Sequence, residues 1–347
     1  MSASTVSSAR PRLALTLGDP ASIGPEIVLK ALADRDLHNL AELVVVGDRA
    51  TLQSTYQSLH AVSDAPLADP DSLEVIDCPT DSAIALGTGN ARSGAASFGY
   101  LETAIQKTMA GQFDGIVTAP IAKYAWAAAG HHFPGQTEVL AQYSHTDRYA
   151  MTFVARSPFT DWRMVVILAT THIPLRQVPD AIDAELVRWK FELLRQMLQT
   201  DLGIKSPRIA VSGLNPHSGE AGQLGREEVD WLSDLVKSLP DATGPVPPDT
   251  LWVQAGQAWR DRDRRAADGF LALYHDQGLI PLKLLAFDRA VNCTIGLPFV
   301  RTSPDHGTAF DIAGKGIADP LSLKEAIALA AELASCKRGQ SPVAVES

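Results

Sequence analysis

The feature that most constrains the fold is a regular alternation of short apolar runs with longer segments whose apolar residues recur at helical spacing. Parallel strands need a long crossover connection, usually a helix, so this rhythm is typical of βαβ units. In the first third of the chain the expected strands and helices are, in order, 12–17, 25–33, 42–46, a helix from Ala50, 74–76, 93–109 and 115–118. The alternation predicts an α/β fold with a mainly parallel sheet covered by helices.

The same rhythm continues through the rest of the chain. Further strands are expected at 152–155, 164–168, 208–211 and 270–274, and further helices at 184–198, 227–239 and 321–333. Residues 240–249 are rich in Pro and Gly and predict a loop or a boundary. Residues 1–11 are rich in Ser and Ala and are expected to form a disordered tail, and residues 336–347 are expected to form a second tail.

Composition excludes several classes of function. The net charge of −10 argues against a nucleic-acid partner, because phosphate backbones demand clustered Lys and Arg. The cysteines Cys78, Cys293 and Cys336 are far apart, so neither a disulfide framework nor a thiolate zinc site is indicated. No apolar run approaches the length of a membrane span. We therefore expect a cytoplasmic protein that acts on a small molecule, with no membrane partner.

Three histidines each lie just beyond the C-terminal end of a predicted strand: His172, His217 and His275. In an open parallel sheet, ligands bind at that edge. Three imidazoles converging there suit a borderline divalent metal with open positions for substrate, and Asp276 or Glu220 could orient a ring. The long separations between them in sequence fit three unrelated loop histidines equally well.

Two further sets of residues could bind a ligand. The segment Asp305–Gly316 is rich in small residues, which allow close approach of a flat or phosphorylated ligand. It lacks the G-x-G-x-x-G pattern, so a Rossmann site is not supported, and a loop with a short helix is the alternative. Lys283, Asn292 and Arg301 follow His275 within a mostly apolar region and could bind an anion, or could be solvated surface residues.

The first loop, Gly18–Glu26, resembles an anion-binding turn at the start of a helix. Asp19 and Glu26 would repel an anion there, so we expect a structural role for this loop.

Taken together, these motifs identify a resemblance that runs from about Leu13 to about Ala331. The chain resembles the 4-hydroxythreonine-4-phosphate dehydrogenases and their PdxA-like relatives. The matching motifs are Gly18-Asp19-Pro20 with Gly24-Pro25-Glu26, Val117-Thr118-Ala119-Pro120, Thr170-Thr171-His172, Leu214-Asn215-Pro216-His217, Tyr274-His275-Asp276-Gln277-Gly278, and Arg301-Thr302-Ser303 with Asp305-His306-Gly307-Thr308-Ala309.

The resemblance implies a fold like that of isocitrate and isopropylmalate dehydrogenases, with two α/β/α domains flanking a cleft. The first domain, on the cofactor side, would comprise 12–130 and 275–335, and a central domain with dimer contacts would comprise 131–274. The family is dimeric, with its site completed by both subunits, so a homodimer with a shared site is expected.

The resemblance also assigns roles to residues. His172, His217 and His275 fall on the family's metal-ligand positions, and the metal would be Zn, Co, Ni, Mn or Mg. Lys283 and Asp276 are the candidate catalytic residues. Substrate contacts would come from Gln136, Thr137, Lys283, Asn292 and Arg301. NAD, or NADP, would bind along His306, Gly307, Thr308 and Asp311.

The chain departs from the family pattern at Gln136, where the family usually carries His, and at Ala122, which replaces a polar residue. Gln can form hydrogen bonds but carries no proton or charge. The expected activity is metal-dependent, NAD-linked oxidation of a secondary alcohol, with decarboxylation, on a small anionic substrate such as 4-phosphohydroxy-L-threonine or a related 4-phosphorylated hydroxy acid. D-threonate and D-erythronate 4-phosphate are the substrates of close relatives.

Three alternatives stay open. A terephthalate-type dehydrogenase acting on an aromatic cis-dihydrodiol carboxylate has the same build, and Gln136 leans toward it. A non-catalytic homologue that binds metal and nucleotide belongs to another class. An acyltransferase on a scaffold like that of phosphotransacetylase would not explain the three histidines.

Overall fold

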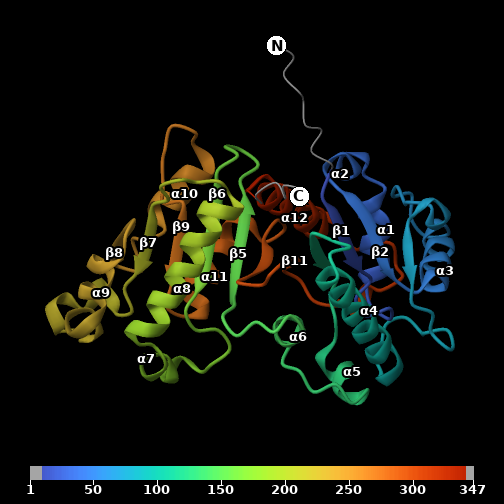
Figure 1. Cartoon of the computed structure of the whole chain (residues 1–347), viewed down its shortest axis with the longest axis horizontal. Helices are drawn as coiled ribbons and strands as arrows, with labels where there is room; N and C mark the ends of the chain where they lie inside the picture. Colours follow the sequence, from blue (N-terminus) through green and yellow to red (C-terminus); the bar gives the residue numbers. More distant parts are fainter. Residues whose placement is uncertain (1–9, 341–347) are drawn as a thin grey trace, which may run out of the picture. The chain divides into compact units, whose positions relative to one another are not determined.

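The structure, a computed structural model, describes residues 10–340 of the chain (Figure 1). The chain divides into two compact units, which are described separately below. Of the described residues, unit 1 contains 10–145 and 299–340, and unit 2 contains 146–298.

Unit 1 is built on a parallel sheet with the strand order β3-β2-β1-β4-β11. Its strands are β1 (Arg12–Thr16), β2 (Glu42–Gly47), β3 (Val75–Asp77), β4 (Gly115–Thr118) and β11 (Val300–Pro304). In the register, Leu13 of β1 lies opposite Leu43 of β2 and Gly115 of β4. Leu13, Ala14 and Leu15 are fully buried, as expected of a parallel strand covered on both faces.

The helices of unit 1 follow its strands in the expected alternation. They are α1 (Gly24–Leu32), α2 (Arg35–Leu40), α3 (Arg49–His60), α4 (Ala91–Met109), α5 (Lys123–Ala128), α6 (Gln136–Tyr143) and α12 (Leu321–Gln340), with short 3₁₀ turns η1 (Pro70–Ser72) and η6 (Phe310–Ile312). Pro25 occupies the first turn of α1, as predicted. Asn90 and Ser93 form a capping box that fixes the start of α4.

Unit 2 has a mixed sheet with the strand order β10-β5-β6-β9-β7-β8. Its strands are β5 (Ala150–Arg156), β6 (Arg163–Leu168), β7 (Ile209–Ser212), β8 (Ala242–Val246), β9 (Gly269–Ala272) and β10 (Val291–Ile295). Strand β5 runs antiparallel to both β10 and β6. The strands β6, β9, β7 and β8 are parallel to one another.

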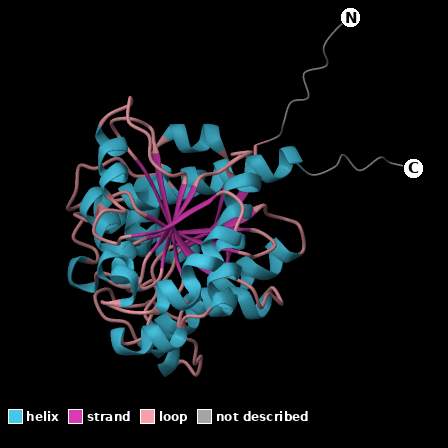
Figure 2. Cartoon of the chain, turned by 90° about the vertical axis from the view of Figure 1, so that its left-hand side faces the viewer, coloured by secondary structure: helices cyan, strands magenta, loops and turns pink. Residues whose placement is uncertain are grey.

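Helices cover the strands of unit 2 (Figure 2). They are α7 (Val178–Ala181), α8 (Ala184–Gln196), α9 (Ser233–Ser238), α10 (Val253–Arg260) and α11 (His275–Ala286), with short helical turns η2 (Leu175–Gln177), η3 (Met197–Asp201), η4 (Pro216–Gly222) and η5 (Glu228–Leu232). Phe153 and Phe270 of the sheet pack with Trp259 of α10 and with Leu279 and Leu282 of α11 in one buried cluster. This cluster holds α11 against the sheet, and α11 begins at one of the three histidines.

The predicted α/β class is confirmed, and the predicted elements outside the last third differ from the observed ones mainly at their ends. The prediction of a loop at 240–249 was wrong, because β8 pairs with β7 there. Strand β8 lies at the edge of the sheet, where proline is tolerated because one side of the strand needs no ladder partner. The helices α2, α5, α6, α7, α10 and α11 and the strands β10 and β11 were not predicted.

The observed units divide the chain differently from the expected boundaries at 130/131 and 274/275. Residues 131–145 belong to unit 1, where α6 packs against α4, and residues 275–298 belong to unit 2, where α11 and β10 pack against β5 and β6. Of the expected tails, residues 336–340 are the end of α12, whereas 1–9 and 341–347 lie outside the described residues. None of the described helices is long and apolar enough to cross a membrane.

Candidate active site

The three histidines follow three neighbouring parallel strands of unit 2. His172 comes after β6, His275 after β9 and His217 after β7, and these strands are adjacent in the order β6-β9-β7 (Figure 1). The carboxyl ends of parallel strands meet at the same edge of a sheet, which is where ligands bind in open α/β folds.

His172 and His275 lie close together. Their ring centroids are 5.7 Å apart, and both side chains line a cavity of about 260 Å³ together with Thr171, Ile173, Tyr274 and Asp276. His275 is the first residue of α11, and its Nδ1 lies 2.8 Å from Oδ1 of Asp276. Asp276 therefore occupies the position of a carboxylate that orients a ring, as one of the two residues proposed for that role.

His217 lies in a turn of unusual backbone geometry. Residues 217–221 all have positive φ angles, and Gly219 is the only glycine among them. Left-handed backbone costs roughly 1–2 kcal/mol for each residue with a side chain, so the surroundings must hold this turn in place. Among residues 10–340 no group of three His, Cys, Asp or Glu side chains is arranged to hold a metal. The structure thus brings together two of the three histidines.

Glu228, which the sequence reasoning missed, holds the His217 turn. Its side chain is 2% exposed, and its Oε1 accepts hydrogen bonds from the backbone N–H groups of Leu214 and Asn215 at 2.7 and 2.9 Å. Its Oε2 accepts a third from Nδ2 of Asn215 at 2.9 Å. Glu228 is the first residue of η5, and no local motif connects it with His217.

Gln277 is a second residue that was missed, and it joins two of the three turns. Its Oε1 accepts from Leu273 N at 2.6 Å, and its Nε2 donates to Gly213 O at 2.8 Å. Thr170 joins the remaining turn, because its Oγ1 donates to Leu273 O at 2.8 Å. The signal for Gln277 was its place directly after His275-Asp276.

Unit 2 also carries Lys283 and Asn292. Lys283 lies on α11, with its Nζ 5.9 Å from the ring centroid of Phe287. Asn292 lies on β10, and its Oδ1 is buried without a hydrogen-bond partner among the described residues. A buried polar atom left without a partner costs about 1–3 kcal/mol, so this acceptor calls for an explanation.

In unit 1, Gln136, Thr137 and Arg301 are buried or half-buried polar residues. Arg301 on β11 is 3% exposed and donates from Nη2 to Thr118 Oγ1 at 2.8 Å. Gln136 donates from Nε2 to Ala119 O at 3.2 Å, whereas its Oε1 is buried with no acceptor bond to any described residue. These contacts place Gln136 and Arg301 beside the residues that follow or end β4.

The predicted cofactor segment lies after β11 in the same unit. His306 Nδ1 lies 3.1 Å from Gly307 O, and since a carbonyl can only accept, Nδ1 carries the proton. Its Nε2 is then an acceptor, and within 10–340 this buried atom has no partner. The space beside Gly307 is open, Thr308 O accepts from Ile23 N, and Asp311 is exposed.

The first loop has the structural role expected of it. Gly18 has φ +67°, and a Cβ there would lie 2.3 Å from Pro120 O. Asp19 accepts from Ala21 N and from Ser93 Oγ, and burial raises the pKa of this carboxyl. Glu26 and Lys30 form a buried ion pair of 2.8 Å, and Lys30 also donates to Gly316 O and Ala318 O. The loop and α1 therefore fix the end of the predicted cofactor segment.

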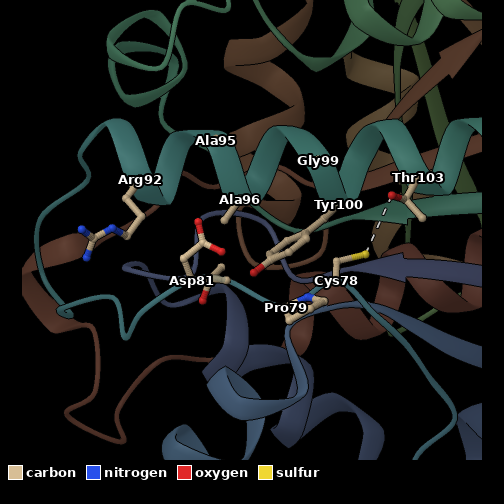
Figure 3. Close-up of a pocket in the computed structure, with 10 residues that line it drawn as sticks. Cys78, Pro79, Asp81, Arg92, Ala95, Ala96, Gly99, Tyr100 and Thr103 are labelled. Carbon is tan, nitrogen blue, oxygen red and sulfur yellow. Dashed lines mark hydrogen bonds between the residues drawn. The ribbon is translucent and has the colours of Figure 1, made fainter.

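A second cavity, of about 350 Å³, lies in unit 1 between α4 and the residues after β3 (Figure 3). Cys78 Sγ contacts Thr103 Oγ1 at 3.8 Å across it, and the side chains of Asp81 and Arg92 at its rim are exposed. Burial raises the pKa of the Cys78 thiol. None of the predicted site residues lines this cavity.

These features define an α/β protein whose candidate ligand groups gather at the carboxyl ends of parallel strands. The chain belongs to the family described as pyridoxal phosphate biosynthetic protein PdxA, which it matches over residues 39–330. The resemblance drawn from the motifs is thereby confirmed.

Individual relatives agree with this assignment. A 4-hydroxythreonine-4-phosphate dehydrogenase of Nostoc sp. (strain PCC 7120) is 59% identical over 95% of this chain and 94% of its own length. A crystal structure of the enzyme so named from Klebsiella pneumoniae is 38% identical, covers 95% of this chain and 100% of its own, and superposes with a TM-score of 0.81. A terephthalate 1,2-cis-dihydrodiol dehydrogenase of Burkholderia xenovorans is 28% identical over 93% of this chain and 98% of its own, with a TM-score of 0.61.

Proposed function

We propose that this protein is a metal-dependent, NAD-linked dehydrogenase that oxidises the secondary alcohol of 4-phosphohydroxy-L-threonine, with decarboxylation of the product. The observation that carries the proposal is the placement of His172, His275 and His217 after three adjacent parallel strands of one sheet. The substrate is inferred from the names of relatives that share more than half of their residues with this chain.

Within a single chain, two of the three proposed ligands, His172 and His275, lie close enough together to bind a divalent metal. Two imidazoles whose centroids are 5.7 Å apart are close enough to share one ion, and the carboxylate of Asp276 next to His275 favours the tautomer that leaves Nε2 available. We propose that His217 supplies the third ligand. Zn, Co, Ni, Mn and Mg all remain candidates, with imidazole favouring the first three.

A second copy of the chain fits the observation that the described part of one chain, residues 10–340, does not assemble three ligands. Helix α11, which begins at His275, exposes Ile280 (58%) and Leu284 (80%), and its C-cap residue Phe287 (71%) is exposed as well. Exposed apolar patches of this kind mark interaction sites. We therefore propose a homodimer in which these apolar residues are covered and the site is shared between subunits.

Binding of the anionic substrate is assigned to the residues that the family resemblance gives as substrate contacts. In unit 1, the buried guanidinium of Arg301 and the hydroxyl of Thr137 suit a phosphate or carboxylate. In unit 1, Gln136 Oε1 is a buried acceptor whose missing bond a substrate hydroxyl or amine can provide. In unit 2, Asn292 Oδ1 is likewise a buried acceptor with no partner among the described residues. Lys283 supplies a second cation.

The segment from His306 to Asp311 fits a nucleotide. The acceptor Nε2 of His306 matches an amino or hydroxyl donor, Gly307 leaves room for close approach, and Asp311 and Thr308 are polar neighbours. We propose NAD as the cofactor, with NADP as the variant that a cofactor titration would detect.

The chemistry divides between the bound groups and the chain. A metal held by the histidines would supply Lewis acidity toward the substrate alcohol, and a nicotinamide cofactor held along His306–Asp311 would supply a hydride acceptor. Asp276 holds the ring of His275 in one orientation and tautomer. Arg301, Thr137 and Gln136 fix the anionic end of the substrate, which sets the direction in which its alcohol points. Lys283 is the candidate for donating a proton to the carbon that loses CO₂.

One alternative is supported by a specific residue. Gln136 stands where the resemblance leads us to expect a histidine that contacts the substrate. The terephthalate dihydrodiol dehydrogenase of Burkholderia xenovorans is similar in fold to this chain. An aromatic cis-dihydrodiol carboxylate is therefore the second candidate substrate. A homologue that binds metal and nucleotide without turnover is the remaining candidate.

The test is NADH formation by metal-reconstituted protein with 4-phosphohydroxy-L-threonine, D-threonate 4-phosphate and the terephthalate cis-dihydrodiol as substrates. Turnover of the first compound above the others is the expected result. Turnover of the dihydrodiol alone would replace the proposed substrate with the aromatic one. Absence of turnover with all three, in protein that binds both metal and NAD, would favour the non-catalytic homologue.

A further inference from the structure

Helix α6 carries Gln136 and Thr137 at its start but has no local device that fixes where it begins. Its N-cap residue is Gly135, which has no side chain to accept a capping hydrogen bond, and the helix has eight residues. A helix of this length is marginal in isolation and depends on tertiary packing. The position of both side chains must therefore be set by contacts elsewhere in unit 1.

Those contacts converge on Phe98, a residue of α4 that is 3% exposed. The ring of His131 stacks on Phe98 with centroids 3.7 Å apart and an interplanar angle of 6°. Phe133 stacks less closely at 5.8 Å, and Tyr143, the last residue of α6, meets Phe98 edge-on at 6.4 Å. One side chain of α4 thus contacts the segment before α6 and also the end of α6.

The segment that carries His131 is tied to α5 as well. His131 N donates to Trp126 O at 2.9 Å, and Trp126 Nε1 donates to Ser97 Oγ of α4 at 2.9 Å. The ring of Trp126 meets Phe98 at 5.2 Å. Residues 126–143 are therefore anchored to α4 from within α5, from the segment between the two helices and from the end of α6.

We infer that the His131–Phe98 stack is a positioning device that sets Gln136 and Thr137 for substrate. His131 acts through the backbone of residues 131–136 and through packing, and it is not itself a catalytic residue. The kinetic part of the test, which uses substrate, rests on the proposed function. Aromatic pairs contribute a modest free energy beyond burial, enough for a tenfold change in an equilibrium.

The experiment compares His131→Ala with His131→Phe, which keeps a flat ring. His60→Ala is the matched control, because His60 also contacts an aromatic ring (Tyr56, 4.4 Å) in unit 1, on α3 rather than α4. We expect His131→Ala to raise the KM for 4-phosphohydroxy-L-threonine about tenfold while kcat changes less than about twofold. His131→Phe and His60→Ala should leave KM close to that of the wild type.

Hydrogen exchange supplies a readout that needs no turnover. In His131→Ala the amides of 136–143 should exchange faster than in the wild type, and in His131→Phe and His60→Ala they should not. The inference is overturned if the exchange of these amides is unchanged in His131→Ala. It is also overturned if they exchange as fast in His131→Phe as in His131→Ala. If the protein turns over none of the substrates, the proposed function fails while the exchange data still decide whether the stack positions α6.

Discussion

The turns that carry His172 and His275 differ from the turn that carries His217, although all three follow adjacent strands of one sheet. The first two bring their rings within 5.7 Å, with one ring oriented by Asp276. The third runs through five residues with positive φ and depends on Glu228 for its backbone hydrogen bonds. The position of a residue at the end of a strand therefore does not settle where its side chain points; the turn does.

The largest effect on activity is expected from replacing His217, the histidine that the structure does not bring together with the other two. His217→Ala should lower kcat to below about one thousandth of the wild-type value, because loss of a metal ligand removes several kcal/mol of transition-state stabilisation. His60→Ala, a histidine on α3, should leave kcat unchanged. Steady-state NADH formation measures both. If His217→Ala retained turnover and its full metal content, only His172 and His275 would be metal ligands, and His217 would be an unrelated loop histidine.

The next effect concerns the residue that holds the His217 turn. Glu228→Gln should lower the free energy of unfolding by about 3 kcal/mol, because a buried carboxylate that accepts three hydrogen bonds loses its charge. Glu227→Gln is the matched control, since Glu227 contacts only the side chain of Asn215 among these groups, at 2.6 Å. Urea denaturation measures the difference. Equal losses in the two variants would mean that Glu228 has no special role in the turn.

A smaller effect is expected from breaking the hydrogen bonds by which Gln277 joins the turn after β9 to the turn after β7. Gln277→Met should cost about 2 kcal/mol of unfolding free energy, because Leu273 N and Gly213 O both lose a buried partner. Gln277→Glu keeps the acceptor for Leu273 N and should lose less. The same urea titration, joined to a metal-affinity measurement, tests whether the turns at β9 and β7 act together. A stability loss with unchanged metal affinity would argue that they do not.

The smallest effect concerns the orientation of His275. Asp276→Asn should weaken metal binding about tenfold, because the amide retains an acceptor but no longer raises the basicity of the ring. Asp288→Asn provides the control, since Asp288 lies just beyond the other end of α11, beside Arg289. Competition with a chromophoric chelator measures both affinities. A similar change in the two variants would assign the effect to general charge rather than to the contact with His275.

Much of the fold follows from the sequence because the pattern and the packing agree. The strand at 115–118 was predicted with its observed bounds, and Pro25 marked the start of α1. The failures have physical causes. The region 279–299 is mostly apolar, and its few polar residues show no clear helical or strand period, so periodicity could not separate α11 from β10. Strand β8 contains Gly244 and Pro245, which predict a loop unless the edge position is known.

The candidate site was predictable in its residue types and strand positions but not in its geometry. The Thr-Thr-His and Tyr-His-Asp-Gln motifs located two of the turns and included Thr170 and Gln277, whose hydrogen bonds join them. The left-handed turn at 217–221 depends on Glu228, which no local spacing connects with His217. The buried acceptors of Gln136, Asn292 and His306 became visible only when burial and hydrogen bonding were known.

The measurement that tests the central claim most directly is X-ray absorption at the metal edge of the zinc-loaded protein, repeated for His217→Ala. Zinc-bound imidazoles give a distinct scattering pattern whose strength reports their number. The account predicts three imidazole ligands per zinc in the wild type and two, with weaker binding, in His217→Ala. Two imidazoles in the wild type, with a spectrum unchanged by His217→Ala, would contradict the claim that the three strand-end histidines form one metal centre.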